Sequence, residues 1–520
     1  MADKMPDYFA AIHLGSEQVS MQIVEYTSLQ NMKVIDRASR AVDLGEEAFQ
    51  TNKISFGTLN EVCELLKGYR RMLAEYGVRD YRLIATTAVR EAENQKYIID
   101  QIKVKTGLDV KVVDVPQEIF YKYVSSYKKL AEQDFLEAKK AVLFVDISSG
   151  GLGMTLWQDG AIKYQQNLKM GALRIKESFS AAQRDSLYFH QALEEFIYAA
   201  IEPVKAYLGH VDIDYLCLSG RETELLLKML GKTWGEVEAC PVSLSEFRAL
   251  YEKIKRLNLS QLQQIFSLSP DDAAMVLPTL VLYHQILSLT TIEQIVIPCD
   301  QFMDGITLLY LAGKHQDPWL QTMEDQVFSL IRTLGKRYQY DKRHSQAVEQ
   351  FSLLIFDRMA RIHGLGNRER LLLQGAAILH DIGKFVSLRS HPYYSYRLIC
   401  SSDILGLSEK EKAVMANVAY YHSQGIPDNH HYNYSILTKK SQVTVAKLSA
   451  ILRLADAMDR SHRQKAIAAA AVFKNNELNI QVKVNEDYSL EEWTFADKAD
   501  FFEDVFGIRA NLERVEKIYV

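Results

Sequence analysis

Several features that define other classes of protein are missing from this chain of 520 residues. The five cysteines are scattered and form no C-x-x-C pair, which excludes a cysteine zinc site or a disulfide framework and is typical of reduced thiols. No apolar run approaches the roughly 18 residues that span a membrane. The formal net charge of -5 gives no overall attraction to nucleic acid or to an anionic membrane.

The remaining composition is that of an ordinary globular protein. Hydrophobic residues make up 48% of the chain and charged residues 24%. The first ten residues are polar and contain no apolar stretch of the kind found in a signal peptide. The length predicts about two to four domains. We therefore expect a cytoplasmic enzyme that binds neither membrane nor nucleic acid.

The run from Leu379 to Lys384 contains an adjacent His380-Asp381 pair followed closely by Gly383. An imidazole nitrogen and a carboxylate oxygen are ligands that a divalent metal accepts together. The pair follows a helical pattern over residues 369–379, so both side chains are predicted at a helix C-terminus, where the backbone opens toward a ligand.

Two further metal-ligand candidates lie on the apolar sides of other predicted helices. His344 precedes an apolar stripe at helical spacing, and Asp456 follows another. A buried histidine or aspartate is costly unless it is paired or metal-bound. The order His, His-Asp, Asp resembles the HD superfamily of metal-dependent phosphohydrolases, which implies Mn²⁺, Fe²⁺, Zn²⁺ or a similar ion. His391 and His422 are either ligands of a second ion or solvated loop histidines.

The first half of the chain repeats itself. Residues 12–21 match residues 145–154 without a gap, so that His13 corresponds to Asp146. Each copy reads as a strand, a turn of small residues and a second strand, and such a turn presents backbone N–H groups to phosphate. Two of these turns facing each other, with His13 opposite Asp146, define the cleft of an actin-like (ribonuclease H-like) α/β fold. The alternative is two unrelated hairpins.

The patterns of hydrophobic residues divide the chain into four predicted domains. The predicted domains are an actin-like lobe at 1–125, a second lobe at 126–313, an all-α HD-type domain at 322–470 and a small α+β domain at 471–520. The stretch 314–321, which contains Pro318, is predicted to be a linker.

These motifs together resemble the exopolyphosphatase / guanosine pentaphosphate phosphohydrolase family over nearly the whole chain. The family pattern A-T-S-A-x-R-x-A-x-N matches residues 85–94, and V-I-S-G-x-E-E-A is similar to residues 113–119. The turn L-G-A-x-R matches residues 170–174, and the helix L-R-L-A-D-A-L-D-R-S-H is nearly intact at 452–462. The resemblance implies hydrolysis of phosphoanhydrides in the cleft, with Mg²⁺ as cofactor.

The departures from the family pattern all fall in the cleft. His13 stands where the family has an aspartate, and Gly153 stands where it has a glutamate. Ser148 and Ser149 replace glycines, and one of the two glutamates before the helix is Gln117. The loss of carboxylates weakens both metal binding and general-base chemistry. The cleft therefore lacks several carboxylates and glycines of the family pattern, whereas the HD ligand set is complete.

Three functions remain open at this point. In the first, the cleft removes the terminal phosphate of polyphosphate or a guanosine polyphosphate. Glu118 then activates water and Asp146 holds Mg²⁺, while the phosphate is bound by Thr87, Arg90, Ser148, Ser149, Gly150 and Gly171.

In the second, a metal held by His344, His380, Asp381 and Asp456 carries the chemistry, Lys384, Arg453 and Arg460 neutralise phosphate, and the cleft is a sensor of nucleotide or polyphosphate. In the third, the protein is a regulator that binds phosphate ligands without turnover. We expect a homodimer in each case.

Overall fold

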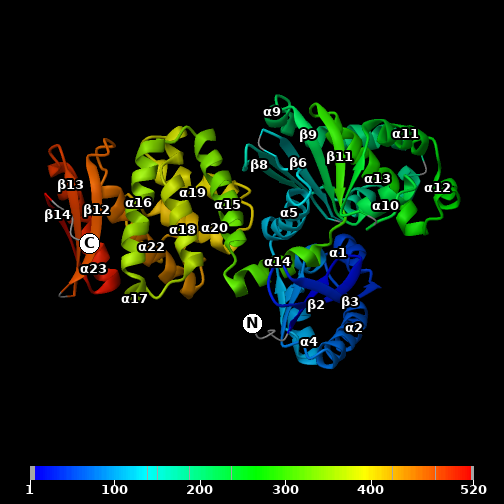
Figure 1. The fold of residues 1–520 in the computed structure, drawn as a ribbon, viewed down its shortest axis with the longest axis horizontal. Helices are drawn as coiled ribbons and strands as arrows, with labels where there is room; N and C mark the ends of the chain where they lie inside the picture. Colours follow the sequence, from blue (N-terminus) through cyan, green and yellow to red (C-terminus); the bar gives the residue numbers. More distant parts are fainter. Residues whose placement is uncertain are drawn as a thin grey trace. The chain divides into compact units, whose positions relative to one another are not determined.

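The computed structural model describes residues 6–516 except 138, 149, 185, 187, 236, 424 and 475. The chain folds into two compact units, residues 1–327 and residues 328–520 (Figure 1).

The first lobe of the first unit is built on a five-stranded sheet in the order β3-β2-β1-β4-β5. Its apolar core lies between this sheet and the helices that cover it. The strands are β1 (Asp7–Leu14), β2 (Gln18–Tyr26), β3 (Met32–Ala41), β4 (Asp80–Ala85) and β5 (Val110–Val112), and the helices are α1 (Leu44–Thr51), α2 (Phe56–Glu75), α3 (Thr87–Glu91), α4 (Gln95–Thr106) and α14 (Phe302–His315), which packs on β1 and β2.

The second lobe contains a six-stranded sheet in the order β10-β11-β9-β6-β7-β8. Its central strand β6 is buried along its whole length, as a strand covered on both faces must be. The strands are β6 (Ala141–Ile147), β7 (Leu152–Gln158), β8 (Ala161–Leu168), β9 (Ile213–Ser219), β10 (Ala239–Val242) and β11 (Ile292–Pro298). The helices are α5 (Val115–Ala131), which packs on β6, β9 and β11, and α6 (Ala172–Glu177), α7 (Ala181–Arg184), α8 (Phe189–Ile201), η1 (Glu202–Val204), α9 (Lys205–Leu208), α10 (Glu222–Met229), α11 (Leu244–Ile254), α12 (Leu259–Phe266) and α13 (Pro270–Leu287).

The strand pairing confirms the internal repeat. In the first lobe β1 pairs antiparallel with β2 and parallel with β4, and in the second lobe β6 pairs antiparallel with β7 and parallel with β9. The outer strands β3 and β8 extend the two meanders in the same way. The first unit therefore has the duplicated α/β architecture of the actin-like fold.

The predicted linker at 314–321 is wrong. Helix α14 continues to His315, and α15 (Pro318–Arg337) begins two residues later. Pro318 begins this helix because proline at a first helical position loses no hydrogen bond and already has a helical φ.

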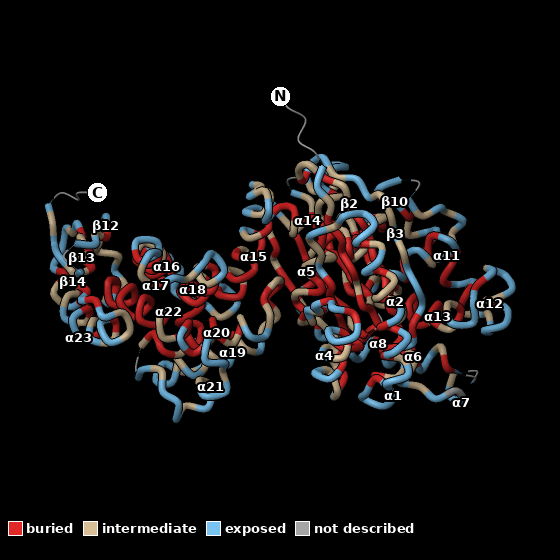
Figure 2. Tube along the Cα trace, turned by 90° about the horizontal axis from the view of Figure 1, so that it is seen from below, coloured by how far each residue is buried: buried red, intermediate tan, exposed pale blue. Residues whose placement is uncertain are grey.

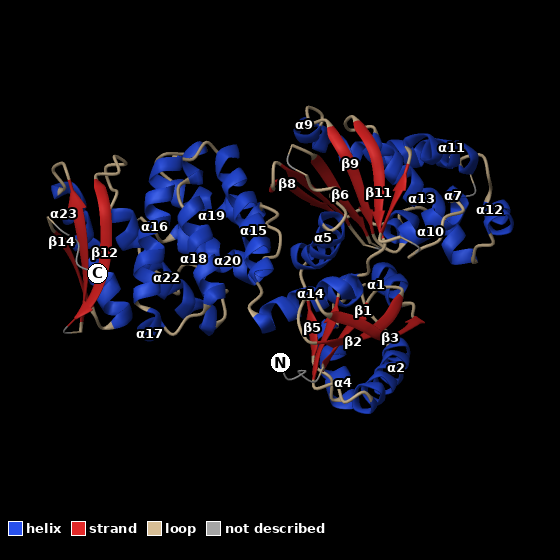
Figure 3. Cartoon of the chain, viewed as in Figure 1, coloured by secondary structure: helices blue, strands red, loops and turns tan. Residues whose placement is uncertain are grey.

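The second unit consists of helices followed by a small sheet, which Figure 3 shows in red near the C-terminus. Its antiparallel pair β12 (Ala466–Lys474) and β13 (Glu477–Val484) is extended by β14 (Arg509–Arg514), which follows α23 (Ser489–Phe506). The preceding helices are α16 (Lys342–Arg358), α17 (Ala360–His363), α18 (Asn367–Leu379), η2 (Ile382–Phe385), α19 (His391–Ser401), α20 (Glu409–Tyr420), α21 (Tyr432–Ser435) and α22 (Lys439–Ala457).

Helix α22 is the central helix of this unit. It packs against α16, α18, α20 and α23, and much of its length is coloured as buried in Figure 2. Across the described residues, no single helix combines the length and apolar composition of a membrane span; α12 and α13 reach them only as a pair, which is bent by 105°.

Candidate functional site

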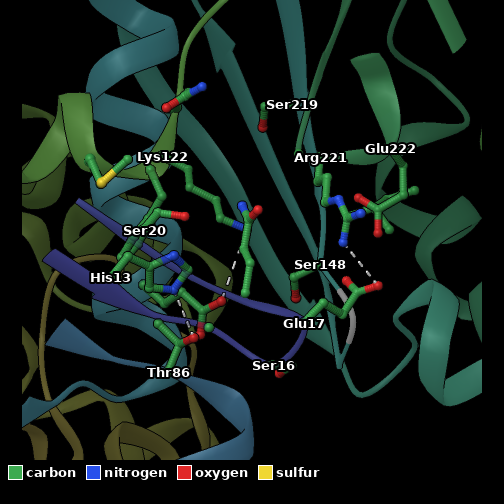
Figure 4. Close-up of a pocket in the computed structure, with 18 of the residues that line it drawn as sticks. His13, Ser16, Glu17, Ser20, Thr86, Lys122, Ser148, Ser219, Arg221 and Glu222 are labelled. Carbon is green, nitrogen blue, oxygen red and sulfur yellow. Dashed lines mark hydrogen bonds and ion pairs between the residues drawn. The ribbon is translucent and has the colours of Figure 1, made fainter. Parts of the chain in front are cut away.

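The two repeated turns of the first unit line one cavity of about 160 Å³ (Figure 4). Gly15, Ser16 and Glu17 come from the first turn, and Ile147 and Ser148 from the second. The sharing of one cavity by both turns was predicted from the repeat. The cavity is also lined by residues of α5, of the loop after β9 and of the start of α14, among them Glu118, Lys122, Ser219, Arg221, Glu222, Asp300 and Phe302.

Glu118 lies in the first turn of α5, whose start is fixed by Asp114 at the N-cap and by Pro116. Its carboxylate accepts a hydrogen bond of 2.9 Å from Arg90 and lies 4.0 Å from the Lys122 ammonium. Burial raises the pKa of Glu118, but these two cations outweigh that effect and hold the pKa below its usual range. Glu118 is therefore an ionised carboxylate in the cavity wall.

The guanidinium of Arg90 donates hydrogen bonds to this carboxylate and to two groups of the first lobe. Its guanidinium also donates to the carbonyl of Val113 at 2.8 Å and to the hydroxyl of Thr87 at 3.0 Å. Arg90 is not among the residues that line the cavity. Its contacts hold Glu118 in position, and its predicted role as a phosphate ligand stays a prediction.

Asp146, at the end of β6, is paired with a lysine of α5. The ammonium of Lys122 lies 2.8 Å from its Oδ2, and the hydroxyl of Ser219 donates to its Oδ1 at 3.2 Å. Burial lowers the pKa of Lys122, but the carboxylates of Asp146 and Glu118 outweigh this effect and raise it, so the ammonium stays charged. The residues present do not fit the Mg²⁺ ion that the family resemblance implies at Asp146.

His13 replaces the family's aspartate with a neutral side chain. It is partly buried, its Nε2 lies 3.1 Å from the hydroxyl of Thr86, and its ring packs on Phe302. Burial lowers the pKa of His13 to about 4. An uncharged imidazole at this position adds no negative charge that would attract a cation.

The predicted phosphate residues are only partly brought together. Thr87 and Ser148 line the cavity, whereas Gly150 is packed so tightly that a Cβ there would lie 2.4 Å from the methyl group of Thr87. Gly171 is the N-cap of α6 and does not line the cavity. Ser149 lies outside the described residues.

The missing glutamate at position 153 is matched by a second change. A Cβ on Gly153 would lie 2.6 Å from Ile119 Cδ1. The family pattern has alanine where this chain has Ile119. The isoleucine therefore fills the space next to Gly153, and apolar packing has replaced the carboxylate.

Sequence reasoning missed several charged residues of this cavity, among them Lys122 and Glu222. Glu222 is 7% exposed, and its Oε2 has no hydrogen-bond partner among the described residues. Burial raises the pKa of Glu222 to about 7, and the carboxylates of Glu17 and Asp146 add to the increase. No motif marked Glu222, because a glutamate in the first turn of a helix is an ordinary helix-start residue.

The raised pKa of Glu222 predicts a pH-dependent stability. Its stabilising contribution is complete below the unfolded-state pKa of 4.5 and is lost as the pH rises through about 7. Glu222→Gln should therefore gain stability over the wild type between these pH values, by on the order of 3 kcal/mol at most. Melting temperatures of both proteins at pH 5 and pH 8 test this.

The exposed Glu224→Gln in the same helix is the control and should show no such trend. A melting-temperature difference between Glu222→Gln and wild type that stays constant with pH would contradict the prediction.

The second unit brings six ionisable side chains to one place. His344 comes from α16, His380 and Asp381 follow α18, His391 begins α19, His422 follows α20 and Asp456 is near the end of α22. All six are buried except His391, which is partly buried. The four predicted ligands and both additional histidines are therefore brought together.

The tautomers of the histidines direct one nitrogen of each ring into the cluster. The Nδ1 atoms of His380, His391 and His422 donate to the backbone carbonyls of Ala377, Leu388 and Ala419. A carbonyl only accepts, so these Nδ1 atoms carry the proton and each neutral ring presents the lone pair of Nε2 to the cluster. The Nδ1 of His344 lies 2.9 Å from the Asp459 carboxylate and has the same orientation.

These Nε2 atoms face each other in two pairs. His344 and His380 are 3.2 Å apart at Nε2, and His391 and His422 are 3.3 Å apart. Two lone pairs at this distance repel unless a cation or a proton lies between them. With bonds of about 2.1 Å, an ion between either pair would have an N–M–N angle of about 100°, which a tetrahedral or octahedral metal accepts.

Asp381 lies between the two histidine pairs. Its Oδ2 is 3.8 Å from His344 Nε2 and 3.5 Å from His380 Nε2, whereas its Oδ1 is 3.4 Å from His391 and 3.5 Å from His422. Asp456 Oδ1 completes the first pair, at 3.4 Å from His344. The two oxygens of Asp381 therefore face different histidine pairs.

Two lysines approach the cluster from outside. Lys384 lies 2.5 Å from Asp381 Oδ2, and its side chain is 36% exposed. Lys498 from α23 lies 2.6 Å from Asp456 Oδ2, the oxygen that is not directed at His344. Each ammonium pairs with a carboxylate of the cluster, and Lys498 also donates to the backbone carbonyl of His422 at 3.3 Å.

A proton can take the place of a metal in this cluster. Burial lowers the pKa of His344, but Asp456 and Asp459 outweigh it and raise the pKa to about 9, while burial lowers the pKa of His380 to about 3. Metal binding at His344 must displace this proton. Sequence reasoning missed Asp459 and also His462, whose ring stacks on His344 at 3.6 Å.

The glycine after the His-Asp pair is required by a close approach. A Cβ on Gly383 would lie 2.0 Å from the carbonyl oxygen of His391. Only glycine therefore lets the start of α19 approach the turn and bring His391 to Asp381.

The chain belongs to the Ppx/GppA phosphatase family. The model of that family matches residues 22–302, and the model of Ppx/GppA phosphatase domain III matches residues 329–498. Two guanosine-5'-triphosphate,3'-diphosphate pyrophosphatases are similar over most of the chain. The protein from Vibrio atlanticus is 23% identical over 82% of this chain and 83% of its own length, and the one from Aeromonas hydrophila is 21% identical over 86% of each.

Solved structures share the fold of the first part of the chain. An exopolyphosphatase from Cytophaga hutchinsonii has a TM-score of 0.53 at 18% identity and covers 59% of this chain and 98% of its own. The Aquifex aeolicus member of the Ppx/GppA family has a TM-score of 0.50 at 17% identity, with coverages of 59% and 99%. These likenesses agree with the duplicated α/β architecture.

Proposed function

We propose that this protein is a phosphoanhydride hydrolase that releases terminal phosphate from polyphosphate or a guanosine polyphosphate. The membership of both units in one phosphatase family carries this proposal. Phosphate release by the full chain, measured separately with polyphosphate and with guanosine polyphosphates, tests it. If the protein turns over neither substrate, the third function remains, in which it is a regulator that binds phosphate ligands without hydrolysing them.

The first candidate centre for this reaction is the cleft. Glu118 is ionised and lies in the wall of the cavity that the two repeated turns share. It would orient or deprotonate the attacking water, while Arg90 holds the carboxylate in place. Thr87 and Ser148 are the predicted phosphate residues that reach the cavity.

The second candidate centre is the cluster of the helical part, which we propose to be of the HD type. The facing Nε2 atoms and the bridging Asp381 favour it. His344, His380, Asp381 and Asp456 would hold one divalent ion, and Asp381, His391 and His422 a second. Divalent ions held there would supply activation of the attacking water and would neutralise charge on the phosphate.

The chain's own residues prepare this second centre. The backbone carbonyls and Asp459 fix the histidine tautomers, and Lys498 holds the outer oxygen of Asp456. Lys384, partly exposed beside Asp381, is placed to pair with a phosphate oxygen.

Two variants assign the reaction to one of the centres. If the cleft carries it, Glu118→Gln loses phosphate release and Asp381→Asn keeps it. If the helical cluster carries it, the result is reversed and Glu118→Gln keeps the activity.

A further inference from the structure

We propose that the ammonium of Lys122 occupies the cation position of the cleft and excludes a divalent metal ion from it. The inference uses the cavity of the proposed function but does not depend on turnover there. The helical cluster would then be the part of this chain that binds divalent metal.

Lys122 already has the contacts that such an ion would make. Its Nζ lies 2.8 Å from Asp146 Oδ2 and 4.0 Å from Glu118 Oε1, so it joins the two carboxylates. The side chains of Lys122, Asp146 and Glu118 are each no more than 12% exposed. Removing one member of a buried charge group leaves the others uncompensated, so the ammonium is held in place.

The remaining carboxylate oxygens are also occupied. Ser219 donates to Asp146 Oδ1, and Arg90 donates to Glu118 Oε2. A divalent ion would therefore have to displace a hydroxyl, a guanidinium or the ammonium, and would then lie beside the buried charge of Lys122.

The charges of this group balance without an ion. Two carboxylates, Glu118 and Asp146, are matched by two cations, Arg90 and Lys122. His13 is neutral, and Gly153 contributes no side chain. A divalent ion between Glu118 and Asp146 would add positive charge directly beside the buried ammonium of Lys122, which is costly.

Mn²⁺ binding to the full chain tests the inference. Asp381→Asn, which disables the helical cluster, is the parent, and bound Mn²⁺ is counted by electron paramagnetic resonance. We expect the parent to bind no Mn²⁺ in the cleft, so that adding Asp146→Asn changes nothing. Adding Lys122→Met to the parent should create one site, which Asp146→Asn then removes.

Lys129→Met, on the same helix but outside the cavity, is the matched control and should create no site. Mn²⁺ bound by the parent and lost with Asp146→Asn would overturn the inference, even if Lys122→Met did not fold. A folded Lys122→Met protein without a new site would also overturn it. The Mn²⁺ experiment measures ion binding alone. The phosphate-release assays test the proposed hydrolysis separately, so failure of one proposal is distinguished from failure of the other.

Discussion

Replacing Asp381 by asparagine is expected to remove both metal ions from the helical cluster at once. The two oxygens of this carboxylate face different histidine pairs, so both positions lose their shared anionic ligand. Metal analysis of purified protein should fall from about two ions per chain to near zero. Thermal stability should fall as well, because an ion present at about 1,000 times its Kd stabilises the folded state by about 4 kcal/mol.

Single-position variants distinguish this bridging arrangement from a general loss of structure. Asp456→Asn should lose the ion between His344 and His380, while His422→Gln should lose only the other ion. The exposed Asp357→Asn, which pairs with Arg370 in the same unit, is the control and should keep both ions. An Asp381→Asn protein with unchanged metal content would refute the assignment.

Glu118→Gln is expected to lower hydrolysis in the cleft by about 10²-fold or more, the usual contribution of a general base. Glutamine keeps an oxygen that accepts the hydrogen bond from Arg90 but cannot take up a proton from water. Initial rates with polyphosphate at saturating concentration measure the effect.

The structure also predicts that Glu118→Gln lowers the stability of the protein, which the sequence did not indicate. Neutral glutamine leaves the half-buried guanidinium of Arg90 without its counter-charge, so the melting temperature should also fall. Rates are therefore compared below the melting temperature of both proteins. Glu132→Gln, at the end of the same helix, should leave the rate unchanged. Equal rates for Glu118→Gln and wild type would contradict the role of Glu118 as a general base and leave it only as the ion-pair partner of Arg90.

The elements with strong local patterns were predictable from the sequence. The repeat predicted two equivalent sheets and a shared cavity, and the HD motif with its apolar helical stripes predicted that four ligands would meet. Such predictions hold because periodicity decides which face of a helix or strand is buried. The placement of His391 depended on the close approach at Gly383, which the spacing alone did not reveal.

The missed residues depend on contacts between distant segments. A lysine on a helix is usually solvated, and the role of Lys122 follows only from its contact with Asp146, which lies on strand β6 and is distant in the sequence. Glu222 is an ordinary helix-start residue until burial raises its pKa. His462 stacks on His344, and its own backbone has a left-handed φ of 57°. The helical pattern before it did not indicate this conformation.

The last helix of the chain makes the C-terminal sheet inseparable from the metal cluster. Lys498 of α23 pairs with Asp456 and also donates to the carbonyl of His422, and Tyr488 donates to the carbonyl of Met458. A chain truncated after residue 470 would therefore leave Asp456 as a buried carboxylate without its lysine. The C-terminal segment is not a detachable module: exchanging it between relatives would preserve the cluster only if the lysine were exchanged with it.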